Sequence, residues 1–84
     1  MDMAKLNVMY FALARDAAGR ERELVSIAGK ATVATVLEQL VALHPGLGAM
    51  KRSIRLAVNH ELADPDHRVN DGDEVGVLPP VAGG

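Results

Sequence analysis

The sequence predicts an α+β fold, in which a mixed β-sheet carries one main helix packed across one of its faces. Two kinds of apolar periodicity predict it. Segments near both ends of the chain alternate apolar with polar residues, as half-buried strands do. One segment between them repeats apolar residues at the spacing of an amphipathic helix. With 84 residues, of which 49% are hydrophobic, the chain is expected to form a single domain over residues 1–84.

The first two strands are predicted at residues 5–11 and 21–27, paired antiparallel. Every second residue of the first segment, starting from Leu6, is apolar, and the second segment alternates charged with apolar residues. Residues 15–19, between them, are expected to form a turn or a short helical turn. Because aromatic residues make up only 2% of the chain, the core must be aliphatic.

The main helix is predicted to follow Thr32, a residue type suited to capping a helix. Its apolar residues recur at a spacing that places them on one face: Val33, Val36, Leu37, Leu40 and Val41. The helix is expected to end at His44, because Pro45 disfavours helical geometry in its predecessor and Gly46 turns freely. His44 is interpreted as a polar residue at a helix end rather than as a metal ligand or catalytic group.

The second half of the chain is predicted to hold a strictly alternating strand at 54–59 and a last strand at 74–78. A short return strand is expected at 62–63. The connections are predicted to be a turn at 59–61, a loop or one helical turn at 64–68, and a tight turn at 70–73.

This order of elements is that of the β-grasp, or ubiquitin-like, fold. Two hairpins flank one helix, so the first and last strands are expected to lie adjacent and parallel in the middle of the sheet. Beyond the last strand, Pro79 and Pro80 cannot donate backbone hydrogen bonds. Residues 79–84 are therefore predicted to form an extended tail.

Composition argues against several classes of function. The net charge is −2, from 9 basic and 11 acidic residues, so the basic excess of a nucleic-acid-binding protein is missing. The one local basic cluster, Lys51, Arg52 and Arg55, is interpreted as solvated surface charge rather than as an anion site. The chain has no cysteine, which excludes disulfides and thiol chemistry. Without an apolar segment of membrane-span length or a secretory signal pattern, a soluble cytoplasmic protein is expected.

The sequence also lacks the motifs of an enzyme that works alone. It contains no phosphate-binding loop of the G-x-x-x-x-G-K-[ST] type and no convincing pair of nucleophile and base. The three histidines, His44, His60 and His67, do not have the spacing of metal ligands. We therefore expect no bound metal or cofactor.

The main functional hypothesis comes from Gly83 and Gly84, the last two residues. A C-terminal diglycine presents an unhindered carboxylate on a tip without side chains. Such a carboxylate is suited to entering another enzyme's active site, where it is activated and attacked. The alternative interpretation is an ordinary frayed terminus.

Longer motifs connect the chain with a known family. It closely resembles the MoaD family, the small sulfur-carrying subunits of molybdopterin synthase, in the runs Asn70-Asp71-Gly72-Asp73-Glu74-Val75 and Leu78-Pro79-Pro80-Val81-Ala82-Gly83-Gly84. Two other parts of the chain fit as well: Val8 to Ala12 with Arg15, and Ala57-Val58-Asn59. The resemblance thus covers nearly the whole chain. One departure is Leu78, because the family often has an aromatic residue at this position.

The resemblance implies a sulfur carrier of molybdenum cofactor biosynthesis. An E1-like adenylating enzyme (MoeB-like) would consume ATP to adenylate the Gly84 carboxylate, and a sulfur donor would convert it to a thiocarboxylate. The carrier would then deliver sulfur to cyclic pyranopterin monophosphate in the large subunit of molybdopterin synthase (MoaE-like), within a heterotetramer. The chain is expected to be needed for catalysis without being an enzyme alone.

The resemblance also indicates where a partner binds. Phe11, Leu62 and Leu78 are expected to form an exposed apolar patch beside the tail. The tail can extend about 20 Å, which is enough to thread a narrow channel, and its prolines would stiffen the base. Its expected contact residues are Pro79, Pro80, Val81 and Ala82, and its expected reactive residues are Gly84, which carries the carboxylate, and Gly83.

Three alternatives stay open at this point. The chain could carry sulfur for thiamin thiazole or cysteine synthesis, or it could be a ubiquitin-like modifier that forms isopeptide bonds with lysines. It could also be a plain interaction domain, whose function would survive loss of Gly83 and Gly84. The run P-P-V-x-G-G favours molybdopterin synthase among the sulfur-carrier pathways.

Overall fold

The computed structural model describes residues 3–79. Of the predicted tail, Pro79 is described, and Pro80, Val81, Ala82, Gly83 and Gly84 lie outside the described residues. The elements in chain order are β1 (Met3–Tyr10), α1 (Ala12–Ala18), β2 (Arg22–Ala28), α2 (Val33–Leu43), the 3₁₀ helix η1 (Pro45–Ser53), β3 (Arg55–Val58), β4 (Glu61–Leu62) and β5 (Glu74–Leu78).

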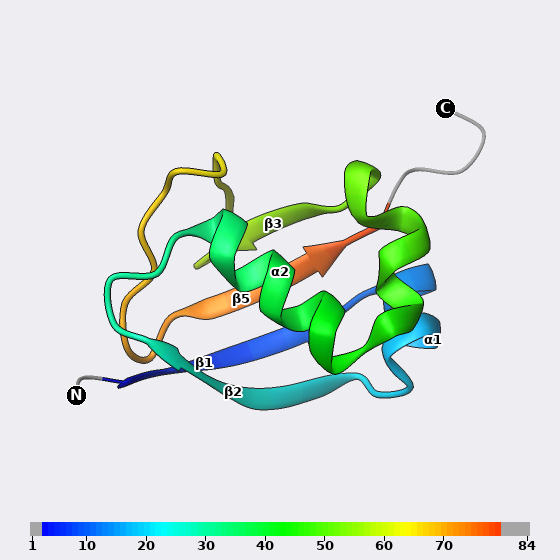
Figure 1. The fold of residues 1–84 in the computed structure, drawn as a ribbon, viewed down its shortest axis with the longest axis horizontal. Coiled ribbons are helices and arrows are strands. Elements are labelled where there is room, and N and C mark those ends of the chain that lie inside the picture. The colour runs from blue at the N-terminus through cyan, green and yellow to red at the C-terminus, as the bar shows by residue number, and fades with distance from the viewer. Residues whose placement is uncertain (1–2, 80–84) are drawn as a thin grey trace.

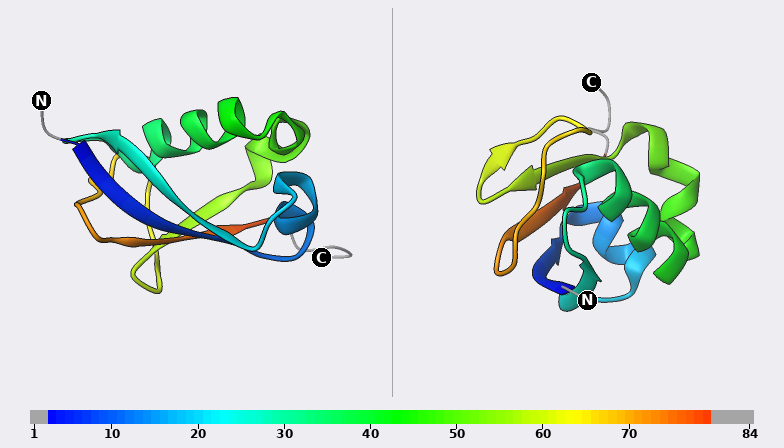
Figure 2. Two further views of the ribbon diagram at one scale, coloured as in Figure 1. Left: turned by 90° about the horizontal axis from the view of Figure 1, so that it is seen from below. Right: turned by 60° about the vertical axis from the view of Figure 1, so that its left-hand side comes forward.

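The five strands form one sheet in the order β2-β1-β5-β3-β4. The first and last strands are adjacent and parallel, with Val8 opposite Val75, and the other pairs are antiparallel. The helix α2 lies across one face of this sheet, while the opposite face carries no helix in the described part of the chain (Figures 1 and 2). The predicted β-grasp fold is confirmed, and we call the helix-free side the open face.

The core lies between the sheet and α2, and it is mainly aliphatic, as the composition predicts. The alternation of β1 is visible in its burial, because Leu6, Val8 and Tyr10 are buried and Lys5 is exposed. Truncating a fully buried aliphatic side chain in so small a core costs about 2–5 kcal/mol. The largest fully buried side chains are Tyr10, Leu6, Ile27, Leu40, Leu47, Val8, Val36, Val75 and Val77.

The helix α2 begins as predicted. Thr32 has an extended backbone, and its Oγ1 accepts a hydrogen bond from the Thr35 backbone N–H at 3.4 Å. Val33, Val36 and Leu40 form its buried face. Its last residue is Leu43, so the predicted end at His44 is also confirmed.

Two helices differ from the prediction. The short helical turn expected at 15–19 is a seven-residue helix, α1, which starts earlier and ends at Gly19 in the left-handed conformation (φ 73°). The segment Pro45–Ser53, for which no element was predicted, is the 3₁₀ helix η1. Proline fits its first turn, and Leu47 is the residue of η1 that is buried in the core.

The turns follow their residue types. Asn59 and His60, which join β3 to β4, both have positive φ angles of 50° and 73°, as a two-residue hairpin turn requires. Gly72, in the predicted turn at 70–73, has a φ of 87°.

The strand 54–59 is observed as Arg55–Val58 and lies between β5 and β4. No helix among residues 3–79 is long and apolar enough to cross a membrane.

Candidate functional site

The open face brings together apolar residues from four strands. Strand pairing sets Met9 beside Gly76, Gly76 beside Ala57, and Ala57 beside Leu62. Directly paired residues point to the same face of a sheet, so these four form one row across the sheet. A second row follows at the end of β5, where Leu78 pairs with Arg55.

Phe11 belongs to the second row because it follows β1 directly. Its backbone N–H donates to the Val77 carbonyl oxygen at 3.2 Å, which continues the pairing of β1 with β5. Its own carbonyl oxygen accepts from the Ala14 N–H at 2.9 Å as α1 begins. Ala12, with a left-handed φ of 49°, turns the chain between them. Phe11 is therefore held at the junction of strand and helix.

These rows define an apolar patch, which we call the open-face patch: Met9, Phe11, Ala57, Leu62, Gly76 and Leu78. Phe11 is 42% exposed and Leu62 is 60% exposed, although both are large apolar residues. A hollow of about 190 Å³ lies within the patch. The structure thus brings the predicted residues Phe11, Leu62 and Leu78 to one face. Exposed apolar groups of this kind mark interaction surfaces.

Gly76 is a member of the patch that the sequence prediction missed. It is buried, and a Cβ built on it would lie 3.2 Å from Cε2 of the Phe11 ring. The ring therefore covers the backbone of β5 at a distance that only glycine permits without adjustment. The alternation of β5 could have indicated that Gly76 belongs to the patch, because it puts Gly76 on the same face as Leu78.

The tail begins at the edge of this patch. β5 ends at Leu78, and Pro79 follows, both half-buried. The predicted contact residues Pro80, Val81 and Ala82, and the predicted reactive residues Gly83 and Gly84, are outside the described residues and stay predictions.

Two acidic residues of the turn after β4 have structural roles. Asp71 and Asp73 both accept hydrogen bonds from backbone N–H groups. Asp71 Oδ1 accepts from the Lys5 N–H at 2.7 Å, and Asp73 Oδ2 accepts from the Asn70 N–H at 2.7 Å. Asn59 Nδ2 donates to Asp73 Oδ1 at 3.1 Å. These bonds fix the start of β5 against β1 and the β3–β4 turn.

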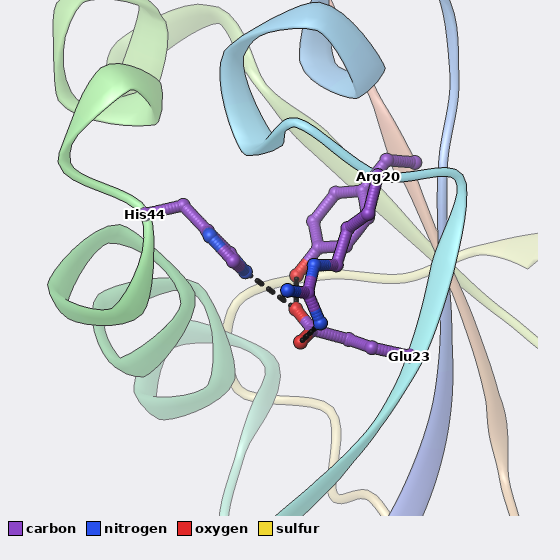
Figure 3. A network of polar contacts seen from close by, with 4 residues as sticks. Arg20, Glu23 and His44 are labelled. Carbon is purple, nitrogen blue, oxygen red and sulfur yellow. Dashed lines mark hydrogen bonds and ion pairs between the residues drawn. The ribbon is translucent and has the colours of Figure 1, made fainter.

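A polar cluster lies on the other side of the sheet, beside the end of α2 (Figure 3). The Glu23 carboxylate accepts a hydrogen bond from the Tyr10 hydroxyl at 2.5 Å, and the same oxygen is 2.5 Å from His44 Nε2. Arg20 Nη1 donates to the other oxygen at 3.0 Å. The Tyr10 and His44 rings meet edge to face, with centroids 5.5 Å apart.

The cluster explains the shifted acidities of its members. Burial by itself raises the pKa of Glu23, but hydrogen bonds from Tyr10 and His44 and the charges of His44 and Arg20 outweigh it, so this pKa is lowered. Burial, with the hydrogen bond to Glu23, raises the pKa of Tyr10 above its ordinary value. His44 therefore does more than end a helix, since it joins α2 to β2 through a carboxylate. We interpret the cluster as a structural junction.

The described residues offer little for chemistry of their own. No group of three or more His, Asp or Glu side chains in residues 3–79 could hold a metal ion. His60 Nε2 lies 3.4 Å from Glu74 Oε1, but the His60 side chain is largely open to solvent and that of Glu74 is partly so. The open-face patch is the candidate functional site within residues 3–79, because exposed apolar surface of this kind often marks an interface.

The chain is similar to known proteins over nearly its whole length. The model of the ThiS family matches residues 8–84. A molybdopterin synthase sulfur carrier subunit of Mycobacterium tuberculosis is 36% identical over 83 residues, which cover 98% of this chain and 100% of the relative. The protein of the same name in Chlamydomonas reinhardtii is 33% identical over 82 residues, covering 95% and 99%.

Solved structures give the same fold. The small archaeal modifier protein 1 of Haloferax volcanii is 31% identical, with a TM-score of 0.81, over 93% of this chain and 99% of that one. A complex of subunits 1 and 2 of the molybdopterin-converting factor from Helicobacter pylori contains a chain that is 23% identical, with a TM-score of 0.67. That match covers 95% of this chain and 99% of the other, and at this identity it shows the fold alone.

Proposed function

The chain belongs to the ThiS/MoaD family, and from this premise we propose that it is the sulfur carrier of molybdenum cofactor biosynthesis, acting as the small subunit of a molybdopterin synthase. Its similarity to sulfur carrier subunits over nearly the full length of both chains supports the proposal. The structural observation that carries it is the open-face patch, which lies where the tail begins.

The proposed chemistry takes place at Gly84. Its carboxylate is ionised at neutral pH, since a C-terminal carboxyl group ordinarily has a pKa of about 3.3–3.7, and it is therefore a poor electrophile. An E1-like adenylating partner would let this carboxylate attack the α-phosphate of ATP, releasing pyrophosphate. Sulfide-level sulfur from a donor would then attack the acyl carbon and expel AMP, leaving a thiocarboxylate. ATP is consumed by the partner in this scheme, which fits a cytoplasmic location.

The thiocarboxylate would next enter the large subunit and transfer sulfur to cyclic pyranopterin monophosphate. Two carrier molecules, each bearing a thiocarboxylate, are needed to supply the two sulfur atoms of the dithiolene. The open-face patch would hold the domain outside while the tail occupies the active site. Full burial of an aromatic or leucine side chain stabilises a complex by about 1.5–3 kcal/mol, so Phe11 and Leu62 can contribute much of the binding free energy.

Binding to the large subunit tests this proposal. The chain would be tagged at its N-terminus, leaving Gly84 free, and titrated with the large subunit from the same host. Leu62→Ala should weaken binding by about tenfold, because about 1.4 kcal/mol of contact is lost. Leu43→Ala is the matched control, because Leu43 is similarly exposed, at 52%, but lies at the end of α2. Equal affinities for the two variants would reject the open face as the binding surface.

A second candidate function is that of a ubiquitin-like protein modifier. The 31% identity with a small archaeal modifier protein favours it specifically. The same activated carboxylate would then form isopeptide bonds with lysines of other proteins. A ladder of high-mass conjugates that disappears when Gly83 and Gly84 are deleted would establish this function. Capture of a thiazole synthase would instead indicate a carrier of another sulfur pathway.

A further inference from the structure

A second hollow, of about 370 Å³, lies at the edge of the sheet between α2 and β3. Leu37, Ile54 and Ala63 are among the apolar residues that line it. Leu37 and Ala63 are only half-buried, so its apolar lining is accessible to another molecule. It is separate from the hollow in the open-face patch, because the two share no lining residue.

Three cations line this second hollow at one end: Lys51, Arg52 and Arg55. All three are exposed, and none makes an ion pair or a side-chain hydrogen bond with another residue of the range 3–79. Residues 39–60 contain these cations and no acidic residue, in a chain whose net charge is −2. Glu38 and Asp64 also line the hollow, from α2 and from the loop after β4, but are not paired with the cations.

The partial negative charge at the C-terminal end of η1 explains the positions of only two of the three cations. Lys51 and Arg52 lie in the last turn of η1, where cations complement the free carbonyl groups of a helix. Arg55 lies beyond η1, on β3, and this explanation does not cover it.

Arg55 connects the hollow to the start of the tail. It is the direct partner of Leu78 in the pairing of β3 with β5, and it also lines the hollow. A protein that covers the open-face patch and receives the tail would therefore also meet Arg55, which lines the hollow on the α2 side of the sheet. A nucleic acid does not fit, because three cations on an acidic protein neutralise few phosphates.

We propose that this hollow binds an acidic segment of the large subunit, whose carboxylates pair with Lys51, Arg52 and Arg55 while an apolar side chain contacts Leu37 and Ala63. The inference rests on the proposed function and adds to it a second, electrostatic contact. Such contacts speed association and orient the partner. Here the contact would align the tail with the channel it enters.

The test measures association and dissociation rates with the purified large subunit of the same host. Three full-length proteins are compared: the natural sequence, the triple variant K51E/R52E/R55E, and the control K5E/K30E/R68E. Both triples change the net charge equally at exposed positions, but the control residues lie toward the other end of the sheet. Rates are recorded at ionic strengths of about 0.01 M and 1 M, where the screening lengths are about 30 Å and 3 Å.

The first triple should slow association at low ionic strength by about tenfold or more, and the difference from the natural sequence should shrink at high ionic strength. The control should be affected much less. Ala34 is an exposed residue of α2 that lines the hollow. The substitution Ala34→Trp should fill the hollow and speed dissociation of the complex with the large subunit.

Three results would overturn the inference. Equal slowing by both triples would mean that only total charge matters, and an unchanged dissociation rate for A34W would mean that the hollow is empty in the complex. Self-association that is lost in K51E/R52E/R55E would assign the hollow to a second copy of the chain. If the natural sequence does not bind the large subunit at either ionic strength, the proposed function is rejected as well.

Discussion

Replacing Gly76 by alanine should separate binding from stability. The added Cβ would lie 3.2 Å from the Phe11 ring and 3.9 Å from the Ala57 Cβ. The second distance is an ordinary contact, so the ring alone must move, by a few tenths of an ångström. Because Phe11 is 42% exposed, its ring can move outward into solvent.

The expected change in stability is therefore small. Alanine in a strand restricts the unfolded chain and gains about 0.4–1 kcal/mol where its backbone conformation is allowed, which offsets the cost of moving the ring. Binding responds differently, since the displaced ring no longer fits the partner. Losing about half of the 1.5–3 kcal/mol that a buried phenylalanine contributes weakens affinity for the large subunit by about threefold to twelvefold.

Gly46→Ala is the control for this substitution. A Cβ at Gly46 would lie 2.9 Å from the Ala17 carbonyl oxygen, which is backbone and cannot move without shifting α1 or η1. This variant should lose about 1–3 kcal/mol of stability yet bind with nearly natural affinity when folded. Urea unfolding and calorimetric titration measure the two quantities. If G76A unfolds much more easily but binds normally, the assignment of Gly76 and Phe11 to the interface is refuted.

Three further predictions concern stability, each measured by urea unfolding. Glu23→Gln should cost about 1–3 kcal/mol at pH 7, because the contacts of the carboxylate with Tyr10, His44 and Arg20 are weakened. The pKa of Glu23 is lowered in the folded state from its ordinary value of 4.5, so its contribution is complete above that pH and is lost as pH falls through the lower, folded value. If the difference in unfolding free energy between E23Q and the natural sequence stays constant below pH 4.5, this account is contradicted. Thr32→Ala should cost about 1 kcal/mol through loss of the cap of α2, and Thr32→Ser should restore most of it. Leu47→Ala should cost about 2–5 kcal/mol, and a value below about 1 kcal/mol would show that η1 is not anchored in the core as observed.

The sheet and α2 could be predicted because their residues signal them locally. The alternation in β1 and β5, the apolar spacing of α2 and the cap at Thr32 each need only neighbouring residues. The parallel pairing of β1 with β5 followed from the order of elements. The bounds of β5 were predicted to the residue, because the turn at 70–73 and Pro79 mark both ends.

What could not be predicted depends on contacts between distant residues. η1 contains Pro45, Gly46 and Gly48 and contributes Leu47 to the core, so no apolar periodicity reveals it. Glu23 and His44 are 21 residues apart and meet only because α2 crosses the sheet. The placement of Phe11, Leu62 and Leu78 on one face could be predicted, whereas the contribution of Gly76 to the open-face patch depends on the position of the Phe11 ring.

One measurement tests the central claim most directly: the mass of the intact chain before and after sulfur transfer. The chain is incubated with the adenylating enzyme of its host, ATP and a sulfur donor, and then with the large subunit and cyclic pyranopterin monophosphate. We predict that the mass rises by the exchange of one oxygen for sulfur at Gly84, and that it returns to the starting value as molybdopterin forms. A chain that never acquires sulfur, or that keeps it while molybdopterin fails to form, would contradict the proposed function.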